Sequence, residues 1–465
     1  MCLARDLVTK HGMIWKFRDE QLPLAGRWSK VRIIGRGIPI QQRRAGGIPA
    51  GPEVANVTSK LRITLTLLFA GLICLRMPDI LLHGRFWAEE GKVFFAEAWR
   101  LPVGRMLFRP YGGYLNLVAN AGAIGARSLV SVERAPYVTI ALALVFQTCP
   151  AILILSSGAS WLRSRWAIVA ALLILATPPA SEEVWLQTLH SQFHLAVCAG
   201  LILAMPAQSG RRLNAFRLAL LVLGPLCGPA CIVLLPFFVL RAMIEKSQAR
   251  WWQTLALLAG SALQIGLFLS VQHGRSYHID SSVLAGVMLV RHLFIPLVGY
   301  RAAAPLADWI HRRYAAGAIP WSTVMLSCAS FAIWIWVVLR RWREAPAWLL
   351  MAGLAVAVLS YYGAIDGGTN LLSVAFGLRY SFAPQALMSF SLLALASARR
   401  GAVSYAAATV VCWLIAVGLA GYFAPSSPIF AHGPDWRREV AAWRADPCHR
   451  LAIWPSGWVM DLPTP

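Results

Sequence analysis

The sequence predicts an all-α integral membrane protein with about 11 transmembrane helices, within a range of roughly 10 to 13. The first observation behind this class is composition: 58% of the 465 residues are hydrophobic and only 14% are charged, whereas soluble domains are about 25% charged. The second is the recurrence of long apolar runs, since roughly 20 apolar residues span the hydrocarbon core of a bilayer. The third is tryptophan at the ends of many runs, as in interfacial aromatic belts.

The apolar runs define the expected helices. We expect them at residues 61–82, 135–156, 166–177, 191–205, 216–226, 229–240, 251–271, 321–339, 347–363, 381–397 and 402–423. Two of these runs, 216–226 and 229–240, are short and meet at a tip rich in glycine and proline, so they form a hairpin of half-helices.

Basic residues set the expected sidedness. The formal net charge is +23, but the arginines separate the apolar runs and form no single patch, which argues against nucleic-acid binding and for contact with anionic headgroups. Five short loops are basic, namely Arg163/Arg165, Arg211/Arg212/Arg217, Arg241/Lys246/Arg250, Arg340/Arg341/Arg343 and Arg399/Arg400. Placing all five in the cytoplasm gives about 11 crossings, with the N-terminus cytoplasmic and the C-terminal tail outside.

Two moderately apolar segments, 84–134 and 273–320, are interrupted by polar residues. We expect them to form interfacial helices in the first and fourth outer loops. The competing topology counts both as spans and has roughly 13 crossings, but it separates the basic loops at 163–165 and 211–212 onto opposite sides, against the charge rule.

The predicted organisation has three parts. Residues 1–60 form a basic cytoplasmic tail that we expect to be poorly ordered, and part of it could be an upstream extension. Residues 61–423 form the polytopic transmembrane domain. Residues 424–465 form a short outer-face tail that is too small for a core of its own, so we expect it to pack on the outer loops or the interface.

The first outer loop holds two adjacent acids, Glu89 and Glu90, among aromatic residues directly after a span. Carboxylates there can act as a general base on an acceptor hydroxyl or hold a divalent cation, and lowered polarity would raise their pKa. The alternative is a solvated loop whose acids serve solubility. For an arbitrary Glu-Glu pair, that second interpretation is the more common one.

A second acidic pair, Glu182 and Glu183, falls in the next predicted outer loop, and His190 and His194 follow it at a spacing that places both on one helix face. Two acidic loops on one side of the membrane would converge on one site. The histidine spacing suggests a metal site but lacks the carboxylate of an HExxH motif. Alternatively, Ser181 and the two acids form a helix cap.

Basic groups are also predicted on the outer side. Arg379, followed by Tyr380, opens a span there, against the positive-inside trend. A phosphate ligand would explain this position, because guanidinium binds phosphate in a bidentate manner. Arg85 and Lys92 are further candidates for the same role, and plain contact with lipid headgroups is the alternative for each of them.

These residues together resemble the GT-C superfamily of polytopic glycosyltransferases that use polyprenyl-phosphate-linked donors. More closely, the chain is similar to uncharacterised bacterial members with a Trp-Ala-Glu-(Asp/Glu)-Gly motif in the first outer loop. The matching positions are Trp87-Ala88-Glu89-Glu90-Gly91, Phe94, Ala96, Pro110-Tyr111, Gly113-Tyr114-Leu115, Glu182/Glu183, Phe193-His194-Leu195, Gly228-Pro229, Arg379-Tyr380 and Pro455-Ser456-Gly457-Trp458. The resemblance covers residues 61–460, and it departs from the pattern at Glu90, where aspartate is usual.

The resemblance implies an enzyme that moves a sugar from a polyprenyl phosphate to a hydroxyl of a glycan or lipid acceptor, on the outer face of a bacterial inner membrane. It assigns the residues as follows: Glu89 and Glu90 as catalytic acids, Glu182 or Glu183 as the second acidic position, Arg379, Tyr380, Arg85 and Lys92 at the donor phosphate, and Tyr111, Tyr114, His190 and His194 lining the site. A divalent cation, Mg²⁺ or Mn²⁺, is compatible with these carboxylates, although no metal ligand set is defined.

Two other functions remain open at this point. A lipid or solute transporter would place ionisable residues in the middle of spans, whereas the runs 347–363 and 402–423 hold no charge; the half-helix hairpin keeps this alternative. A non-catalytic subunit of a cell-envelope glycan system would share the scaffold without the activity.

Overall fold

A computed structural model of the chain describes residues 58–207, 209–271, 279–364, 368–398, 401–430 and 432–463. The predicted basic tail lies almost wholly outside these residues, and so do Arg399 and Arg400. The described chain is mostly helical, and the strands within it form two short antiparallel hairpins. A mostly helical chain of this composition fits the predicted membrane class.

The first part of the described chain has one long helix followed by short elements. Helix α1 ends at Arg76, and Pro78 begins the next helix, a position where proline costs no hydrogen bond. The predicted single helix at 61–82 is therefore two helices divided at Met77. The elements are α1 (Ser59–Arg76), α2 (Pro78–His83), a π-helix (Glu90–Phe95), α3 (Ala96–Arg100), α4 (Val103–Leu107), β1 (Pro110–Tyr111), β2 (Tyr114–Leu115) and α5 (Leu117–Leu129).

Each apolar run predicted after residue 134 is helical in the structure. Helices α12 (Ser281–Leu289), α13 (Ile295–Val298) and α14 (Tyr300–Ala315) lie in the segment 273–320, which was expected at the interface. The helices of the predicted runs are α6 (Ala135–Leu155), α7 (Arg165–Ala176), α8 (Ser191–Ala204), α9 (Arg211–Leu226), α10 (Leu235–Glu245), α11 (Gln248–Ser270), α15 (Trp321–Leu339), α16 (Ala345–Tyr362), α17 (Arg379–Ala396) and α18 (Ala402–Ala420). The half-helix hairpin is present as α9, a break at 227–228, and a 3₁₀ segment, Pro229–Leu234, that leads into α10.

In the ranges that the structure describes, six helices are long and apolar enough to cross a membrane: Val132–Leu155, Gln248–Ser270, Ser281–Val298, Trp321–Leu339, Ala345–Tyr362 and Ala402–Ala420. One of them differs from the sequence prediction. Ser281–Val298 lies in the segment expected at the outer interface, yet its length and composition suit a span. Helices α7 and α8 are apolar but shorter.

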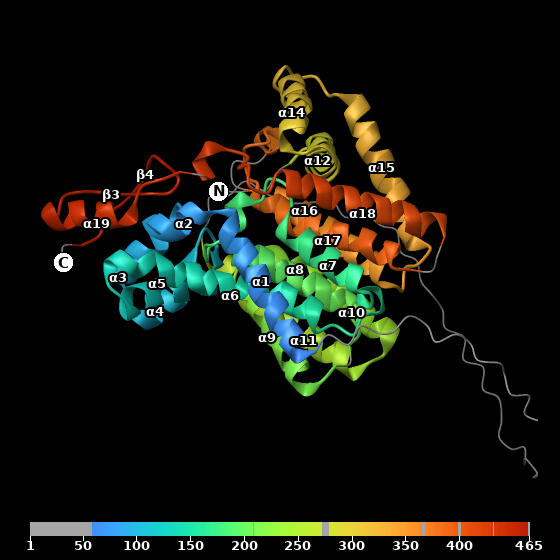
Figure 1. The fold of residues 1–465 in the computed structure, drawn as a ribbon, viewed down its shortest axis with the longest axis horizontal. Helices are drawn as coiled ribbons and strands as arrows, with labels where there is room; N and C mark the ends of the chain where they lie inside the picture. The colour runs from blue at the N-terminus through green and yellow to red at the C-terminus, as the bar shows by residue number, and fades with distance from the viewer. Residues whose placement is uncertain are drawn as a thin grey trace, which may run out of the picture. The chain divides into compact units, whose positions relative to one another are not determined.

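Helix α8 lies at the centre of the packing, and all of its residues are buried. It contacts α6, α9, α16 and α17, and α16, α17 and α18 run side by side (Figure 1). Small residues allow this close approach, as is common between membrane helices. A Cβ on Gly200 of α8 would lie 2.4 Å from Leu387 Cδ2 of α17.

The C-terminal tail contains α19 (Trp436–Ala445) and the hairpin of β3 (Leu451–Ile453) and β4 (Trp458–Met460), drawn in red at the left of Figure 1. It packs against the first predicted outer loop, as the sequence predicts. The indole of Trp436 meets Phe86 edge-on and donates to the Val132 carbonyl at 2.7 Å. The backbone of Trp454 bonds to residues on both sides of Trp87.

Candidate functional site

Three segments far apart in the sequence meet around the start of α8: the first loop at 85–90, the second at 181–190, and the start of α17. Glu90 joins the first two segments, because its carboxylate accepts hydrogen bonds from Thr188 N at 2.7 Å and Thr188 Oγ1 at 2.5 Å. Glu183 joins the second to the third, because its carboxylate pairs with the Arg379 guanidinium and accepts from Arg379 N at 3.1 Å.

The second loop is itself buried, which is unusual because loop backbone must find hydrogen-bond partners. Side chains from surrounding elements provide them. Asn116 donates to Leu189 O at 2.8 Å, and Gln147 both donates to Val184 O and accepts from Leu186 N. These contacts fix the path of residues 181–190 and hence the positions of the acids and histidines on it.

A cavity opens where the three segments meet, with about 720 Å³ of space including its opening to solvent. Predicted site residues from all three segments line it, together with residues of α8, α16 and the break after α9. The lining residues are Glu89, Tyr111, Tyr114, Leu189, His190, Gln192, Phe193, Pro229, Ala230, Leu359, Ser360, Gly363, Arg379 and Tyr380.

Glu89 and Glu90 have different environments although they are adjacent. Ala88 before them has a left-handed backbone with φ of 40°. Glu89 is half-buried and lines the cavity, and no hydrogen bond or ion pair joins its carboxylate to any other described residue. Glu90 is 1% exposed and lies behind the wall. Burial raises the pKa of Glu90, and its bonds to Thr188 oppose that shift only in part.

Arg85 does not reach the cavity. Its side chain is fully buried between the rings of Trp87 and Trp454, at 5.2 and 5.7 Å, and it donates to the Trp185 carbonyl. Burial lowers its pKa to about 9. Arg85 therefore ties the first two loops to the tail. Lys92 also points elsewhere, with its ammonium 5.4 Å from the Trp458 ring.

Arg379 does line the cavity, and a quarter of its side chain is exposed there. Burial raises the pKa of the Glu183 carboxyl, but the Arg379 charge and amide outweigh this and hold the pKa below its usual range. Glu183 thus stays ionised and orients the guanidinium. Tyr380 packs edge-on against Phe193 of α8.

Glu182 lies outside the cavity lining. Its carboxylate accepts from Ser426 Oγ at 2.9 Å and lies 3.9 Å from Arg76, which also bonds the carbonyls of Ala176 and Pro178. Of the two predicted acids in this loop, Glu183 supports the cavity, whereas Glu182 attaches the loop to α1 and the tail.

His190 lines the cavity and His194 lies behind it. Burial lowers the pKa of His190 to about 4, so the ring is neutral near pH 7. Its Nδ1 lies 2.9 Å from the Glu183 carbonyl oxygen, which can only accept, so Nδ1 carries the proton and Nε2 keeps a lone pair. His194 bonds to Val184 O at 3.3 Å and packs on Trp185 and Phe382. The other ring nitrogen of His194, Nδ1, is buried without a hydrogen-bond partner among the described atoms.

Divalent-cation binding has limited support from the geometry. Among the residues that the structure describes, no three of His, Cys, Asp and Glu come together as a ligand set. Glu89 is the carboxylate that faces the cavity, and a cation there would take its remaining ligands from substrate oxygens.

Sequence reasoning missed several lining residues. Gln192 and Phe193 follow the histidine on α8, and Ser360 and Gly363 come from the end of α16. A uniformly apolar run gives no sign of which end meets a cavity. For Pro229 and Ala230 the sequence did contain a signal, because the Gly228-Pro229 dipeptide predicts the break that follows α9.

Comparison of the chain with protein-family models, with curated proteins and with solved structures gave no match.

Proposed function

We propose that the protein is a membrane glycosyltransferase of GT-C type, which moves a sugar from a polyprenyl-phosphate donor to an acceptor hydroxyl. The observation that carries the proposal is a cavity in which several aromatic rings surround the Arg379 guanidinium and the Glu89 carboxylate, which has no partner among the described residues. Such a cavity holds groups suited to both ends of the reaction, because one must accept a proton and another must stabilise a phosphate leaving group.

In this proposal Glu89 is the general base for the acceptor hydroxyl, since no protein cation neutralises it in the described structure. Arg379 contacts the donor phosphate through the quarter of its side chain that is exposed, while Glu183 fixes its orientation. Tyr111, Tyr114 and Tyr380 lie against the sugar and acceptor. Glu90 is a positioning residue that holds the second loop through Thr188.

We further propose that the chain crosses the membrane about 11 times with the N-terminus in the cytoplasm. This topology places both loops and Arg379 on the outer face of a bacterial inner membrane, where a lipid-linked sugar can enter from the bilayer. Reporters fused after Arg134, Trp185 and Arg313 should all report the outer side. A cytoplasmic signal at the second of these with an outer signal at the first would refute it.

The activity test uses the full-length protein and a panel of polyprenyl-phosphate-linked hexoses and pentoses, with release of polyprenyl phosphate measured by mass spectrometry. Glu89→Gln should lower the rate by about 100-fold or more, the usual effect of losing a general base. Its thermal midpoint should match wild type, because the Glu89 carboxylate has no partner among the described residues. Undiminished transfer by this folded variant would overturn the assignment of the base.

A transporter is the second candidate, and one observation favours it. The break between α9 and α10 places Pro229 and Ala230 at the cavity wall, and interrupted helices line the sites of many transporters. The two functions differ in their products. A transporter would move the labelled lipid or solute across a vesicle membrane without releasing polyprenyl phosphate.

A further inference from the structure

A second concentration of charge lies at the other end of the central helix. Helix α8 begins at the cavity and ends at Ala204, about 20 Å away at 1.5 Å per residue. Around that end, Arg217 of α9, Arg241 of α10 and Arg250 of α11 are all buried, with 1%, 8% and 1% of their surfaces exposed. This arginine cluster is separate from the proposed catalytic site.

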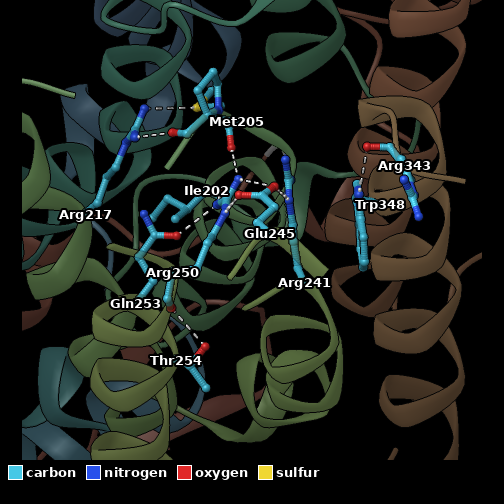
Figure 2. A network of polar contacts seen from close by, with 11 residues as sticks. Ile202, Met205, Arg217, Arg241, Glu245, Arg250, Gln253, Thr254, Arg343 and Trp348 are labelled. Carbon is cyan, nitrogen blue, oxygen red and sulfur yellow. Dashed lines mark hydrogen bonds and ion pairs between the residues drawn. The ribbon is translucent and has the colours of Figure 1, made fainter. Parts of the chain in front are cut away.

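Two of the three guanidinium groups share a single carboxylate, and no further carboxylate bonds the cluster among the described residues. Glu245 accepts from Arg241 Nε at 2.5 Å and from Arg250 Nε at 2.7 Å, and Figure 2 shows it between those two side chains. Arg217 lies on the other side of Met205 and bonds the Pro206 carbonyl at 2.8 Å. Arginine remains charged at any working pH. The cluster thus has three positive charges and one negative charge.

Helix ends surround the cluster. Arg250 donates to the Ile202 and Met205 carbonyls at the end of α8, and Glu245 is the last residue of α10. The C-termini of α8 and α10 each carry about half a negative charge, but α9 and α11 begin close by in the chain, at Arg211 and Gln248, and their N-termini each carry about half a positive charge. The helix ends therefore leave an excess of about two positive charges. Neutral side chains could bond the same carbonyls, so helix capping alone does not require three arginines.

The cluster also contains guanidinium N–H donors that have no acceptor among the described atoms. Arg241 Nη1 and Arg217 Nε are buried without a hydrogen-bond partner among the described atoms. The Arg241 side chain retains 10% exposure, and its guanidinium lies over the Trp348 ring at 5.4 Å. Arg241 is therefore at the edge of the cluster, where the exposed part of its side chain can meet a group from outside.

We propose that this cluster binds one phosphate group of an anionic phospholipid, with Arg241 as its main contact. A phosphodiester carries a negative charge that offsets part of the excess, and its oxygens suit guanidinium donors. The loops around the cluster, with Arg211, Arg212, Lys246, Arg340, Arg341 and Arg343, are those predicted to face the anionic cytoplasmic leaflet. The headgroup would lock the ends of α8, α9, α10 and α11 together.

The test titrates full-length protein in neutral detergent with phosphatidylglycerol or with phosphatidylcholine and follows the melting midpoint by tryptophan fluorescence. Phosphatidylglycerol should raise the midpoint to a plateau, and phosphatidylcholine should not. Arg241→Gln should weaken the response about tenfold or more in lipid concentration, as expected for a lost charge-assisted hydrogen bond. Arg212→Gln is the matched control, because Arg212 is exposed on the same group of loops, and it should behave as wild type.

Glu245→Gln gives a prediction of opposite sign that remains informative if Arg241→Gln fails to fold. Removing the competing carboxylate should move the phosphatidylglycerol response to lower lipid concentration, whereas a purely structural ion pair would give no such shift. Native mass spectrometry of wild type should retain one phosphatidylglycerol. Equal weakening by Arg241→Gln and Arg212→Gln would show a diffuse basic surface and overturn the proposal. An equal response to inorganic phosphate would overturn the lipid as its source.

Discussion

Replacing Glu90 by alanine or by glutamine should separate a positioning role from a chemical one. In the Glu90→Ala protein, Thr188 N and Thr188 Oγ1 lose their acceptor in a buried place. Each buried unpaired donor costs about 1–3 kcal/mol, so the loss is about 2–6 kcal/mol. Part is offset, because removing a carboxylate whose pKa is raised by burial also removes its desolvation cost. We therefore expect a net loss of stability of about 2–4 kcal/mol.

Glu90→Gln should behave differently, because the amide oxygen can still accept from both Thr188 donors. It loses the attraction to the Arg85 charge, the stronger bonding of an ionised acceptor and the 3.4 Å bond from Trp87 N to Oε2, so we expect a change of about 1–2 kcal/mol. Thr188→Val keeps the backbone donor and loses the hydroxyl, and it should fall between the two. The assay is denaturant unfolding in mixed micelles, with donor turnover measured on the same samples.

Two results would refute this reasoning. Equal stability of Glu90→Ala and Glu90→Gln would show that the bonds to Thr188 contribute little. Complete loss of turnover in Glu90→Gln with an unchanged unfolding curve would show that Glu90 takes part in the chemistry, and Glu89 would then lose its assignment as the single base.

Further predictions concern pH and helix packing. Burial lowers the pKa of His190 to about 4 from its ordinary 6.5, so between these pH values the unfolded chain binds a proton that the folded chain does not. The stability is therefore present above pH 6.5 and falls by up to about 3 kcal/mol as the pH drops toward 4. His190→Gln should reduce this loss of stability in melting curves recorded between pH 7.5 and 4.5, and an unaltered pH dependence would contradict the prediction. Gly260→Ala places a Cβ 2.4 Å from Val222 O where α11 meets α9 and should cost about 1–3 kcal/mol, whereas Gly266→Ala on the same helix meets open space and should be neutral or slightly stabilising.

The helices were predictable because apolar runs and proline positions carry local information. The division at Met77 has a local signal too, since the next residue is a proline, but hydropathy averaged over 61–82 hides it. The buried second loop had no such signal. Asn116 and Gln147 each lie more than 30 residues from the backbone groups of this loop that they bond, so their role there depends on tertiary packing that one sequence does not encode locally.

Tertiary packing also decides the roles of individual residues in the candidate site, and the sequence does not show them. Sequence reasoning identified two acidic pairs but had no means to separate the members of each pair. In each pair one carboxylate serves the cavity: Glu89 lines it, and Glu183 pairs with Arg379. The other carboxylate of each pair holds a neighbouring part of the chain: Glu90 bonds Thr188, and Glu182 bonds Ser426. Adjacent residues in a turn point in different directions, so a pair of acids supplies one group for each task. In each pair the acid that serves the cavity is held in place by a neighbour whose carboxylate is bonded to another segment, and this division of tasks gives a physical reason for acids to occur in pairs at this site.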